Sequence, residues 1–471
     1  MDHARSPGAT PRGGAQLNPA IFREYDIRGI ADRDFDADFA RQLGLAVGTL
    51  VQERGGKLVS VGRDCRLTSD RYAEALCAGL AATGLDVLDV GVCPTPLVYF
   101  TLFAWNLDGG IQITGSHNPA DYNGFKVCVG RESLHGEQIQ DLRHRIEAGR
   151  FRSGTGSVRP RPVVAPYQDY VVENVGALSR PIRVVVDAGN GTAGPVAPAI
   201  YRRLGAEVTE LFCEMDGRFP NHHPDPTVPE NVAQLIAAVR AEKAELGIAF
   251  DGDADRIGVV DAQGRIIWGD ELLVLYARDV LSRNPGAVIV SEVKCSQRLY
   301  DDIAARGGRG IMWKAGHSLL KAKMKETGAL LGGEMSGHIF FKERYFGYDD
   351  AIYSGARLLE ILARTGKRVD ELLADLPPSH STPEIRIDCP DDQKFAVADR
   401  VRDQFRAEGG DIIDVDGVRV RFPHGWGLLR ASNTQPVLVM RFEAESPAEL
   451  ATYQATVERA VAAARGAVAA K

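Results

Sequence analysis

The stretch IAFDGDADR, residues 248–256, shows most clearly how this chain is built. A short apolar run, residues 248–250, ends abruptly in a turn of aspartate and glycine. An apolar run without polar alternation is typical of a strand that is buried on both faces, as in sheets covered by helices. The stretch therefore predicts an α/β layer with a polar loop at the carboxyl end of a strand, where open α/β sheets place their ligands.

The same pattern occurs at four other places along the chain. Apolar runs at residues 58–61, 111–113, 184–186 and 288–290 lead into polar turns at residues 62–66, 114–119, 187–192 and 291–296. Helix-like stretches follow the runs at 58–61, 111–113 and 184–186. This recurrence predicts several α/β units with mixed, mainly parallel sheets.

The last part of the chain differs in character. Residues 384–388 alternate between polar and apolar, residues 415–418 carry a hairpin signal, and an Ala-rich helix begins at Pro447. These features predict an α+β domain with an antiparallel sheet. Pro- and Gly-rich stretches at 151–166 and 376–383 and a weaker break near 261–264, which could also be a simple hairpin, divide the chain. We predict a disordered leader over residues 1–17 and four domains over residues 18–162, 163–264, 265–375 and 376–471.

Composition narrows the class of protein. The chain has 471 residues, of which 44% are hydrophobic and 25% charged, as in globular proteins. A net charge of −7 argues against a nucleic-acid partner, and no apolar run is long enough for a transmembrane helix. The leader lacks the apolar segment of a secretory signal, and the seven cysteines form no CxxC pair. We therefore expect reduced thiols, a cytoplasmic location and no membrane partner.

The acidic turn carries three carboxylates at spacing two, Asp251, Asp253 and Asp255. In an extended loop this spacing directs the three side chains the same way, and their mutual repulsion is relieved by a hard cation such as Mg²⁺. A solvated acidic turn is the alternative. An EF-hand is excluded because its required Gly and Glu are absent. Arg256 follows directly and could bind a phosphoryl oxygen that is shared with the metal.

The turn TGSHNP, residues 114–119, places Ser116 after a predicted buried strand. Gly115 permits close backbone approach, and backbone N–H groups there could stabilise a phosphate attached to the serine. A helix N-cap serine is the alternative. Arg28 and Lys126 each lie beside a glycine turn, and Lys126 could neutralise such a phosphate or move a proton. A surface cation is the alternative for both.

Two later loops carry the groups that a sugar phosphate needs. The loop GEMSGH, residues 333–338, offers Glu334 and Ser336 for sugar hydroxyls and His338 as a proton donor, although His338 could equally be a loop histidine. The loop RASNT, residues 430–434, groups a guanidinium, two hydroxyls and an amide, as in an anion-binding nest. A metal role for the adjacent His222 and His223 is not expected, because paired histidines in a Pro-rich loop are more often structural.

Taken together and in this order, these motifs resemble those of the α-D-phosphohexomutase family. The resemblance extends from about Phe22 to Phe442, and it is close for the bacterial phosphomannomutase/phosphoglucomutase branch. It implies a four-domain architecture in which Ser116 is phosphorylated. It also implies reversible interconversion of hexose 1-phosphates and 6-phosphates through a 1,6-bisphosphate. Sugar phosphates are the implied partners, with glucose 1,6-bisphosphate or mannose 1,6-bisphosphate as activator and a monomer as the working expectation.

The resemblance also implies roles for individual residues. The implied metal ligands are the aspartate triad and Ser116. The implied catalytic residues are Ser116, His117, Lys126, Arg256, His338 and Arg28. The implied substrate-binding residues are Tyr25, Lys294, His317, Glu334, Ser336, His338, Arg430, Ser432, Asn433 and Thr434.

Three alternatives stay open at this point. Phosphoglucosamine mutases usually carry Gln at the position of Met335 and Gly at the position of Asn433, so both residues favour the mannose and glucose branch. An aspartyl phosphatase of the haloacid dehalogenase type would use Asp251 as its nucleophile, but that family prefers Thr or Val where this chain has Asp255. A catalytically silent sugar-phosphate binding protein would keep the loops without the reaction.

Overall fold

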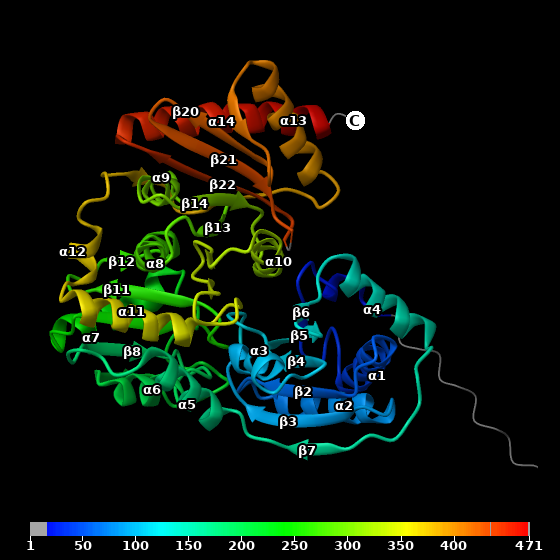
Figure 1. The fold of residues 1–471 in the computed structure, drawn as a ribbon. Coiled ribbons are helices and arrows are strands. Elements are labelled where there is room, and N and C mark those ends of the chain that lie inside the picture. The colour runs from blue at the N-terminus through cyan, green and yellow to red at the C-terminus, as the bar shows by residue number, and fades with distance from the viewer. Residues whose placement is uncertain (1–16, 434, 470–471) are drawn as a thin grey trace, which may run out of the picture.

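A computed structural model of the chain describes residues 17–433 and 435–469 (Figure 1). The predicted leader falls outside the described residues except for Leu17, and Thr434 lies outside them as well. The described chain forms four sheets, each with its own set of helices. No helix within residues 17–433 and 435–469 is long and apolar enough to cross a membrane.

The first sheet has the strand order β1-β5-β4-β2-β3-β7, with β6 paired to β5. Strands β4, β2, β3 and β7 are parallel, whereas β5 runs antiparallel to β4 and to β1. A 3₁₀ turn (Pro19–Ile21) precedes β1. The strands are β1 (Ile27–Ile30), β2 (Leu58–Arg63), β3 (Asp86–Val92), β4 (Gly109–Ile113), β5 (Tyr122–Val129), β6 (Glu132–Ser133) and β7 (Val158–Pro160), and the helices are α1 (Ala37–Glu53), α2 (Ser69–Ala82), α3 (Thr95–Ala104) and α4 (Glu137–Ala148).

The second sheet has the order β12-β11-β10-β8-β9. Strands β10, β8 and β9 are parallel, and β10 and β11 form an antiparallel pair around residues 251–256. The weak break near residue 262 is the simple hairpin between β11 and β12. The elements are α5 (Val164–Val175), β8 (Arg183–Asp187), α6 (Ala197–Leu204), β9 (Glu207–Leu211), a 3₁₀ turn (Pro229–Val232), α7 (Ala233–Ala241), β10 (Leu246–Phe250), β11 (Ile257–Asp261) and β12 (Ile266–Ile267).

The third sheet has the order β14-β13-β15-β16, with β16 antiparallel to β15. Its helix α11 reaches across to pack on α5, α6 and β11 of the second unit (Figure 1). The elements are α8 (Gly269–Arg283), β13 (Val288–Glu292), α9 (Gln297–Ala305), β14 (Arg309–Trp313), α10 (His317–Thr327), β15 (Leu331–Gly333), β16 (Ile339–Phe341), α11 (Ala351–Thr365) and α12 (Val369–Leu373).

The fourth sheet is antiparallel throughout, which confirms the predicted C-terminal α+β domain. Two helices, α13 and α14, pack against it. The elements are β17 (His380–Ser381), β18 (Ile385–Asp388), α13 (Lys394–Ala407), β19 (Asp411–Ile413), β20 (Val418–Phe422), β21 (Gly425–Ala431), β22 (Val437–Ala444) and α14 (Pro447–Ala469).

The first three sheets are mixed, with an antiparallel hairpin at one edge of the parallel strands. These hairpins, β4–β5, β10–β11 and β15–β16, enclose the loops at residues 114–121, 251–256 and 334–338. The expected helix after residues 111–113 is therefore wrong, because strand β5 follows the loop and returns along β4. Each loop is consequently anchored at both ends by strand pairing, which restricts its backbone more than a single strand would.

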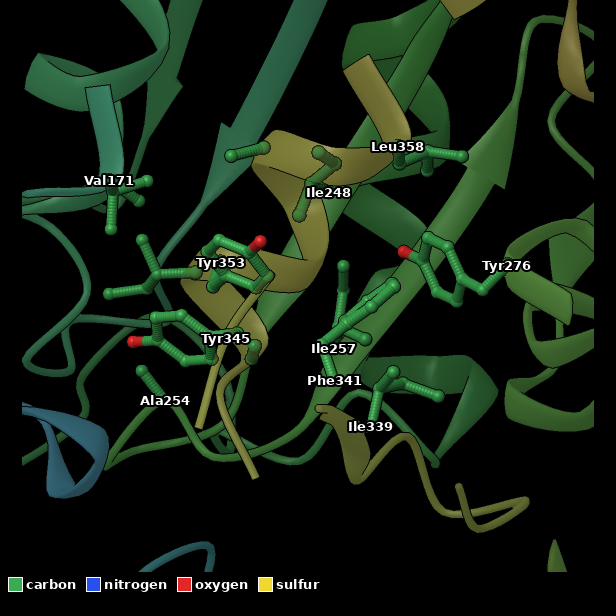
Figure 2. Close-up of a cluster of buried hydrophobic side chains, with 14 of the residues drawn as sticks. Val171, Ile248, Ala254, Ile257, Tyr276, Ile339, Phe341, Tyr345, Tyr353 and Leu358 are labelled. Carbon is green, nitrogen blue, oxygen red and sulfur yellow. The ribbon is translucent and has the colours of Figure 1, made fainter. Parts of the chain in front are cut away.

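Several clusters of buried apolar side chains hold the described part of the molecule together. One cluster of buried side chains runs through the first three domains, from Leu97 on α3 to Ile248 on β10 and Leu358 on α11. Figure 2 shows part of it, where Ile248 and Ile257 meet side chains of the third domain. The fourth domain has its own core. The first domain also has a core of its own, which includes Ile27 and Leu76. One large cluster thus joins part of the first domain to the second and third, whereas the fourth domain is attached separately.

Candidate active site

A single cavity of about 930 Å³ is lined by side chains from all four domains. It gathers most of the residues that the sequence predicts for the site. These are Tyr25, Arg28, Ser116, His117, Lys126, Arg256, Lys294, His317, Glu334, Ser336, His338, Arg430, Ser432 and Asn433. Asp251, Asp253 and Asp255 lie fully buried behind the residues that line it, and Thr434 lies outside the described part of the chain.

Ser116 lies in the loop between β4 and β5, so the helix N-cap alternative is wrong. Its backbone has a φ of 49°, a left-handed conformation that is uncommon for a residue with a side chain. Its hydroxyl donates to Asp251 Oδ2 at 2.8 Å and lies 3.1 Å from His117 Nδ1. The backbone N–H of Ser116 donates to Thr114 Oγ1 at 2.8 Å. The serine hydroxyl is therefore directed at the acidic loop of the second domain.

Arg66 holds this loop from behind, and the sequence did not single it out. Its buried guanidinium donates to the carbonyl oxygens of Ser116 (2.8 Å), Asn118 (2.6 Å) and Tyr122 (2.9 Å), and it also contacts that of Pro119. These carbonyl oxygens therefore point towards Arg66, and their partial negative charges are turned towards its guanidinium.

Asp64 completes this support and shows why Gly115 is needed. Asp64 accepts from Arg66 and from the backbone N–H of Gly115 at 3.1 Å. A Cβ at residue 115 would lie 2.5 Å from Arg66 Cζ. Glycine therefore leaves room for the guanidinium, and any larger residue there would require Arg66 to shift.

The aspartate triad is buried, so the alternative of a solvated acidic turn is wrong. Asp251, Asp253 and Asp255 are each 0% exposed, and one ligand atom from each lies within 4.8 Å of the others. Among the described residues, Asp253 Oδ1 and Asp255 Oδ1 have no hydrogen-bond partner. Burial and the two neighbouring carboxylates raise the pKa of Asp251 well above its ordinary value. Clustered oxygen donors with unused lone pairs fit a hard divalent cation such as Mg²⁺.

Two of the predicted cations lie beside the triad. Lys126 is buried, so it is not a surface cation, whereas Arg28 is half-buried, with 19% of its side chain exposed. Lys126 Nζ donates to Asp253 Oδ2 at 2.8 Å and also contacts Asp255. Burial lowers the pKa of Lys126, but the carboxylates outweigh this effect and raise the pKa above its ordinary value. Arg28 donates to Asn118 Oδ1 at 2.6 Å in the serine loop. Lys126 therefore contacts two of the three carboxylates, while Asp251 accepts from Ser116.

The third domain contributes a pair of imidazoles and the loop that follows β15. Arg256 Nε donates to His338 Nε2 at 3.0 Å, and the rings of His338 and His317 stack with centroids 5.4 Å apart. Burial lowers the pKa of His317 well below its ordinary value. Glu334 Oε1 accepts the backbone N–H of Gly316 at 2.7 Å. Glu334 is thereby held at the edge of the cavity.

The fourth domain closes the other side of the cavity. Arg430 Nε donates to Asp416 Oδ2 at 2.9 Å, and Asn433 Nδ2 donates to the hydroxyl of Tyr25 at 3.1 Å. That hydroxyl in turn donates to the carbonyl of Ala315 at 2.9 Å. Tyr25 therefore links the first domain to the third and the fourth.

Lys294 ties the third domain to the fourth at the same cavity. Its Nζ donates to Glu384 Oε2 at 3.1 Å. Away from this end, His222 Nε2 lies 3.0 Å from Asp187 Oδ2, an ion-pair geometry that supports the expected structural role. His223 lines the cavity.

Four family models match the chain in order. They describe the alpha/beta/alpha domains I, II and III of phosphoglucomutase/phosphomannomutase and its C-terminal domain. The matches cover residues 19–153, 165–264, 268–380 and 384–460. The fold and the site together define the class of the phosphohexomutases, which are intramolecular phosphotransferases.

Individual relatives agree with this class. The chain is 51% identical to a phosphomannomutase/phosphoglucomutase of Pseudomonas aeruginosa over 434 residues, 92% of this chain and 94% of the relative. It is 48% identical to a phosphoglucomutase of Neisseria gonorrhoeae, with 93% and 96% covered. A solved phosphoglucomutase/phosphomannomutase family protein of Burkholderia thailandensis superposes with a TM-score of 0.91 at 47% identity, over 96% of this chain and 98% of that one. The chain belongs to the phosphoglucomutase/phosphomannomutase family.

Proposed function

We propose that this enzyme interconverts the 1-phosphates and 6-phosphates of glucose and mannose, with Ser116 as the phosphate carrier. One observation carries the proposal. The Ser116 hydroxyl donates to Asp251 inside the same cavity that Arg430, Ser432 and Asn433 line from the fourth domain. One end of the cleft can thus exchange a phosphoryl group while the other holds a second phosphate. The relatives named for both mannose and glucose support the substrate class.

The triad and Ser116 would hold Mg²⁺. The fit rests on the buried carboxylates and on their two unpartnered oxygens. An Aspergillus fumigatus N-acetylphosphoglucosamine mutase of related fold, 16% identical with a TM-score of 0.61, is described in complex with GlcNAc-6P and magnesium. When bound, the ion supplies positive charge that stabilises the phosphoryl group during transfer.

The chain's own residues account for the rest of the transfer. The phosphoryl group leaves Ser116 Oγ for the free hydroxyl of the sugar, and His338 Nε2 accepts the proton of that hydroxyl. Lys126, Arg256 and Arg28 offset the charge on the moving group. His117, whose Nδ1 lies 3.1 Å from Ser116 Oγ, returns a proton to the serine.

Sugar binding occupies the opposite side of the cleft. The phosphate that is already on the sugar binds Arg430, Ser432, Asn433 and Thr434, as in other anion nests. Hydroxyls of the sugar bind Glu334 and Ser336, with Tyr25, Lys294 and His317 at the rim. The product of the first transfer is a 1,6-bisphosphate. It turns end over end in the cavity, and its second phosphate returns to Ser116.

The decisive experiment compares rates on mannose, glucose and glucosamine 1-phosphates, with Mg²⁺ and a trace of glucose 1,6-bisphosphate. We expect turnover of the first two and a phosphopeptide that contains Ser116. A preference for glucosamine 1-phosphate would make the enzyme a phosphoglucosamine mutase, and label on Asp251 would make it an aspartyl phosphatase. Binding without turnover would leave a silent sugar-phosphate binding protein.

The remaining expectations belong to the same proposal. A glucose or mannose 1,6-bisphosphate activates the enzyme by phosphorylating Ser116. A phosphohexomutase of related fold, 14% identical with a TM-score of 0.62, is described in complex with glucose 1,6-bisphosphate. A cytoplasmic location, a monomeric state and the four domain ranges given above stay predictions.

A further inference from the structure

Asp349, to which no motif of the sequence pointed, lies among three basic side chains, His317, Lys321 and His338. It directly precedes the N-cap of α11 and is 0% exposed. Its Oδ2 lies 3.2 Å from Nδ1 of His338 and 3.6 Å from Nδ1 of His317, and its Oδ1 accepts from Lys321 Nζ at 3.1 Å. Two of the imidazoles proposed for the site therefore turn the same ring nitrogen towards one carboxylate.

The contact on the other side of His338 defines where its proton lies. Arg256 can only donate, and its Nε–H points at His338 Nε2 at 3.0 Å. Nε2 must therefore present a lone pair. A neutral imidazole with a lone pair on Nε2 carries its proton on Nδ1. The carboxylate oxygen nearest to this nitrogen is Asp349 Oδ2 at 3.2 Å, and Asp255 Oδ1 is farther away at 3.6 Å.

The polar atoms between His338, His317 and Asp349 lack hydrogen-bond partners in the described part of the chain. These atoms are His338 Nδ1, His317 Nδ1 and Asp349 Oδ2, so the 3.2 Å contact between His338 Nδ1 and Asp349 Oδ2 is close but not aligned as a hydrogen bond. A buried donor without an acceptor is unfavourable, so the ring position that brings Nδ1–H to the carboxylate is the favoured one. The stacked ring of His317 further restricts rotation of His338.

We infer that Asp349 is a positioning residue for the phosphoryl transfer, which holds His338 with its proton on Nδ1 and its lone pair on Nε2. The inference rests on the proposed function. The sugar hydroxyl takes the place of Arg256 at Nε2 and gives up its proton there. The hydroxyl oxygen's electron pair forms the new bond to phosphorus, and the Ser116 Oγ–P bond breaks with its electron pair on Oγ, which is reprotonated through His117. Asp349 stabilises the imidazolium that forms.

Asp349 suits this task better than its neighbour Asp255. Asp255 contacts Lys126 and belongs to the proposed metal triad, so its charge is already engaged. Asp349 has Lys321 on its other oxygen. Burial raises the pKa of Asp349, but Lys321 and the two histidines outweigh it and hold the pKa well below its ordinary value. The carboxylate therefore stays ionised and accepts from Nδ1.

A cation is the competing occupant of this space. Ligand atoms of Asp255, His338 and Asp349 lie within 4.8 Å of one another. A cation on His338 Nδ1 would need the lone pair of that nitrogen, whereas the contact from Arg256 requires the lone pair on Nε2. A neutral ring cannot offer both, so the two hypotheses predict opposite protonation of Nδ1.

The test is the tautomer of His338 in the full-length enzyme, read from two-bond ¹H–¹⁵N correlations with ¹⁵N-histidine. The His338→Gln variant assigns the signal. We expect a protonated Nδ1 in the wild type and a loss of this preference in Asp349→Asn, whose amide can donate to Nδ1. Asp350→Asn is the matched control, because Asp350 is equally buried but accepts from the hydroxyls of Tyr167 (2.8 Å) and Tyr345 (2.7 Å). It should destabilise the fold and leave the tautomer unchanged.

Kinetics give the second readout. We expect Asp349→Asn to lower kcat by about 10²- to 10⁴-fold, the range for a lost general base, with KM within about twofold of the wild type. Phosphorylation of Ser116 by glucose 1,6-bisphosphate should be slowed about as much as mutase turnover with glucose 1-phosphate, because it is the reverse of the same transfer and His338 must then return a proton to the departing sugar oxygen.

Three outcomes would overturn the inference. They are a wild-type His338 with its proton on Nε2, an Asp349→Asn enzyme with unchanged tautomer and kcat, and an unprotonated Nδ1 whose signal responds to EDTA, which would favour the cation. If Asp349→Asn does not fold, the wild-type tautomer alone decides. If the wild type lacks mutase activity altogether, the proposed function fails, but the spectrum still tests the Asp349–His338 contact.

Discussion

The two ends of the cleft are built in different ways. At the serine end, Ser116 and Lys126 of the first domain bond directly to buried aspartates of the second. Behind them, the first three domains share a continuous apolar core. At the opposite end, Arg430 and its neighbours belong to a domain with a core of its own. The serine end is therefore held by buried contacts behind the cavity, and the position of the other end depends on the contact between the third and fourth domains.

That contact is largely polar. Arg419 reaches out of the fourth domain to donate to the carbonyls of Val293 (2.7 Å) and Cys295 (2.8 Å), and its guanidinium stacks 3.7 Å from the ring centre of Trp426. Among the described residues, a small apolar cluster joins the two sides, made of Val293, Trp426 and Leu428 with two partly buried neighbours. We infer that changes at the serine end affect mainly the chemical step, and changes at the domain contact affect mainly sugar-phosphate binding and local stability.

The strongest test of this contrast is Ser116→Ala. Without the hydroxyl that carries the phosphoryl group, kcat should fall by more than about 10³-fold and the protein should take up no label from a ³²P-labelled bisphosphate. Ser432→Ala at the opposite end is the control. It should raise KM by several-fold and keep kcat near the wild-type value. Equal effects on kcat from both variants would remove the contrast.

Much of the fold could be predicted because short stretches of sequence show the hydrophobic pattern of the strands they form. Apolar runs that end in polar turns marked β2, β4, β8, β10 and β13, and alternation marked the antiparallel fourth domain. The hairpin after Ser116 could not be predicted in this way. The alternation of Phe125, Val127 and Val129 is compatible with a strand, but it does not say that this strand pairs back on β4, because register and pairing depend on distant partners.

The site divides along the same line. Ser116 and the three aspartates belong to short motifs whose chemistry can be recognised from the sequence alone. Arg66 and Asp349 are single charged residues without such a motif, and their roles come from what the fold brings to them. Arg66 meets carbonyls about 50 residues away, and Asp349 meets His338 only through the turn before α11. Contacts of this kind are set by tertiary packing, which periodicity does not encode.

The metal loop gives the next largest effect. Asp253→Asn removes one of the carboxylates from the triad and should lower kcat by about 10²-fold while raising the Mg²⁺ concentration needed for half-maximal activity. A Mg²⁺ titration of the rate measures both. Thr95→Val is the graded control, because the Thr95 hydroxyl donates to Asp253 without belonging to the triad. Thr95→Val should lower kcat only a few-fold. A loss of kcat as large as that of Asp253→Asn would count against Asp253 as a metal ligand.

Arg66→Lys tests whether the serine loop is held by more than charge. A lysine keeps the charge opposite Asp64 but cannot reach the four carbonyls that the guanidinium gathers. We expect kcat to fall by about 10- to 10²-fold, KM to change little, and amide exchange of the loop to accelerate. Arg71→Lys is the matched control, since Arg71 is half-exposed and pairs only near the surface with Asp32. Unaltered exchange in Arg66→Lys would contradict the holding role.

At the domain contact, Arg419→Met should separate binding from chemistry. The substitution leaves two buried carbonyls without their donor, which costs about 2–4 kcal/mol at this interface. We expect KM for hexose 1-phosphates to rise several-fold while kcat stays within about twofold. Calorimetry should then resolve an earlier transition for the fourth domain. A single cooperative transition with unchanged KM would mean that the fourth domain is as firmly attached as the others.

The smallest effect should come from Glu384→Gln, and it should depend on pH. Lys294, only 3.1 Å away, lowers the pKa of Glu384 to about 2 from an ordinary value of 4.5. A lowered pKa in the folded state means that the contribution is complete above about pH 4.5 and is lost as the pH falls towards 2. The variant should therefore be less stable by about 1 kcal/mol near pH 6, and the difference should shrink below pH 4.5. Asp414→Asn removes an exposed pair with Arg406 inside the fourth domain and should not change the midpoint measurably. The stability difference between Glu384→Gln and wild type could instead stay constant from pH 6 to pH 3. Glu384 would then act through packing, and charge would contribute less to the domain contact than its hydrogen bonds indicate.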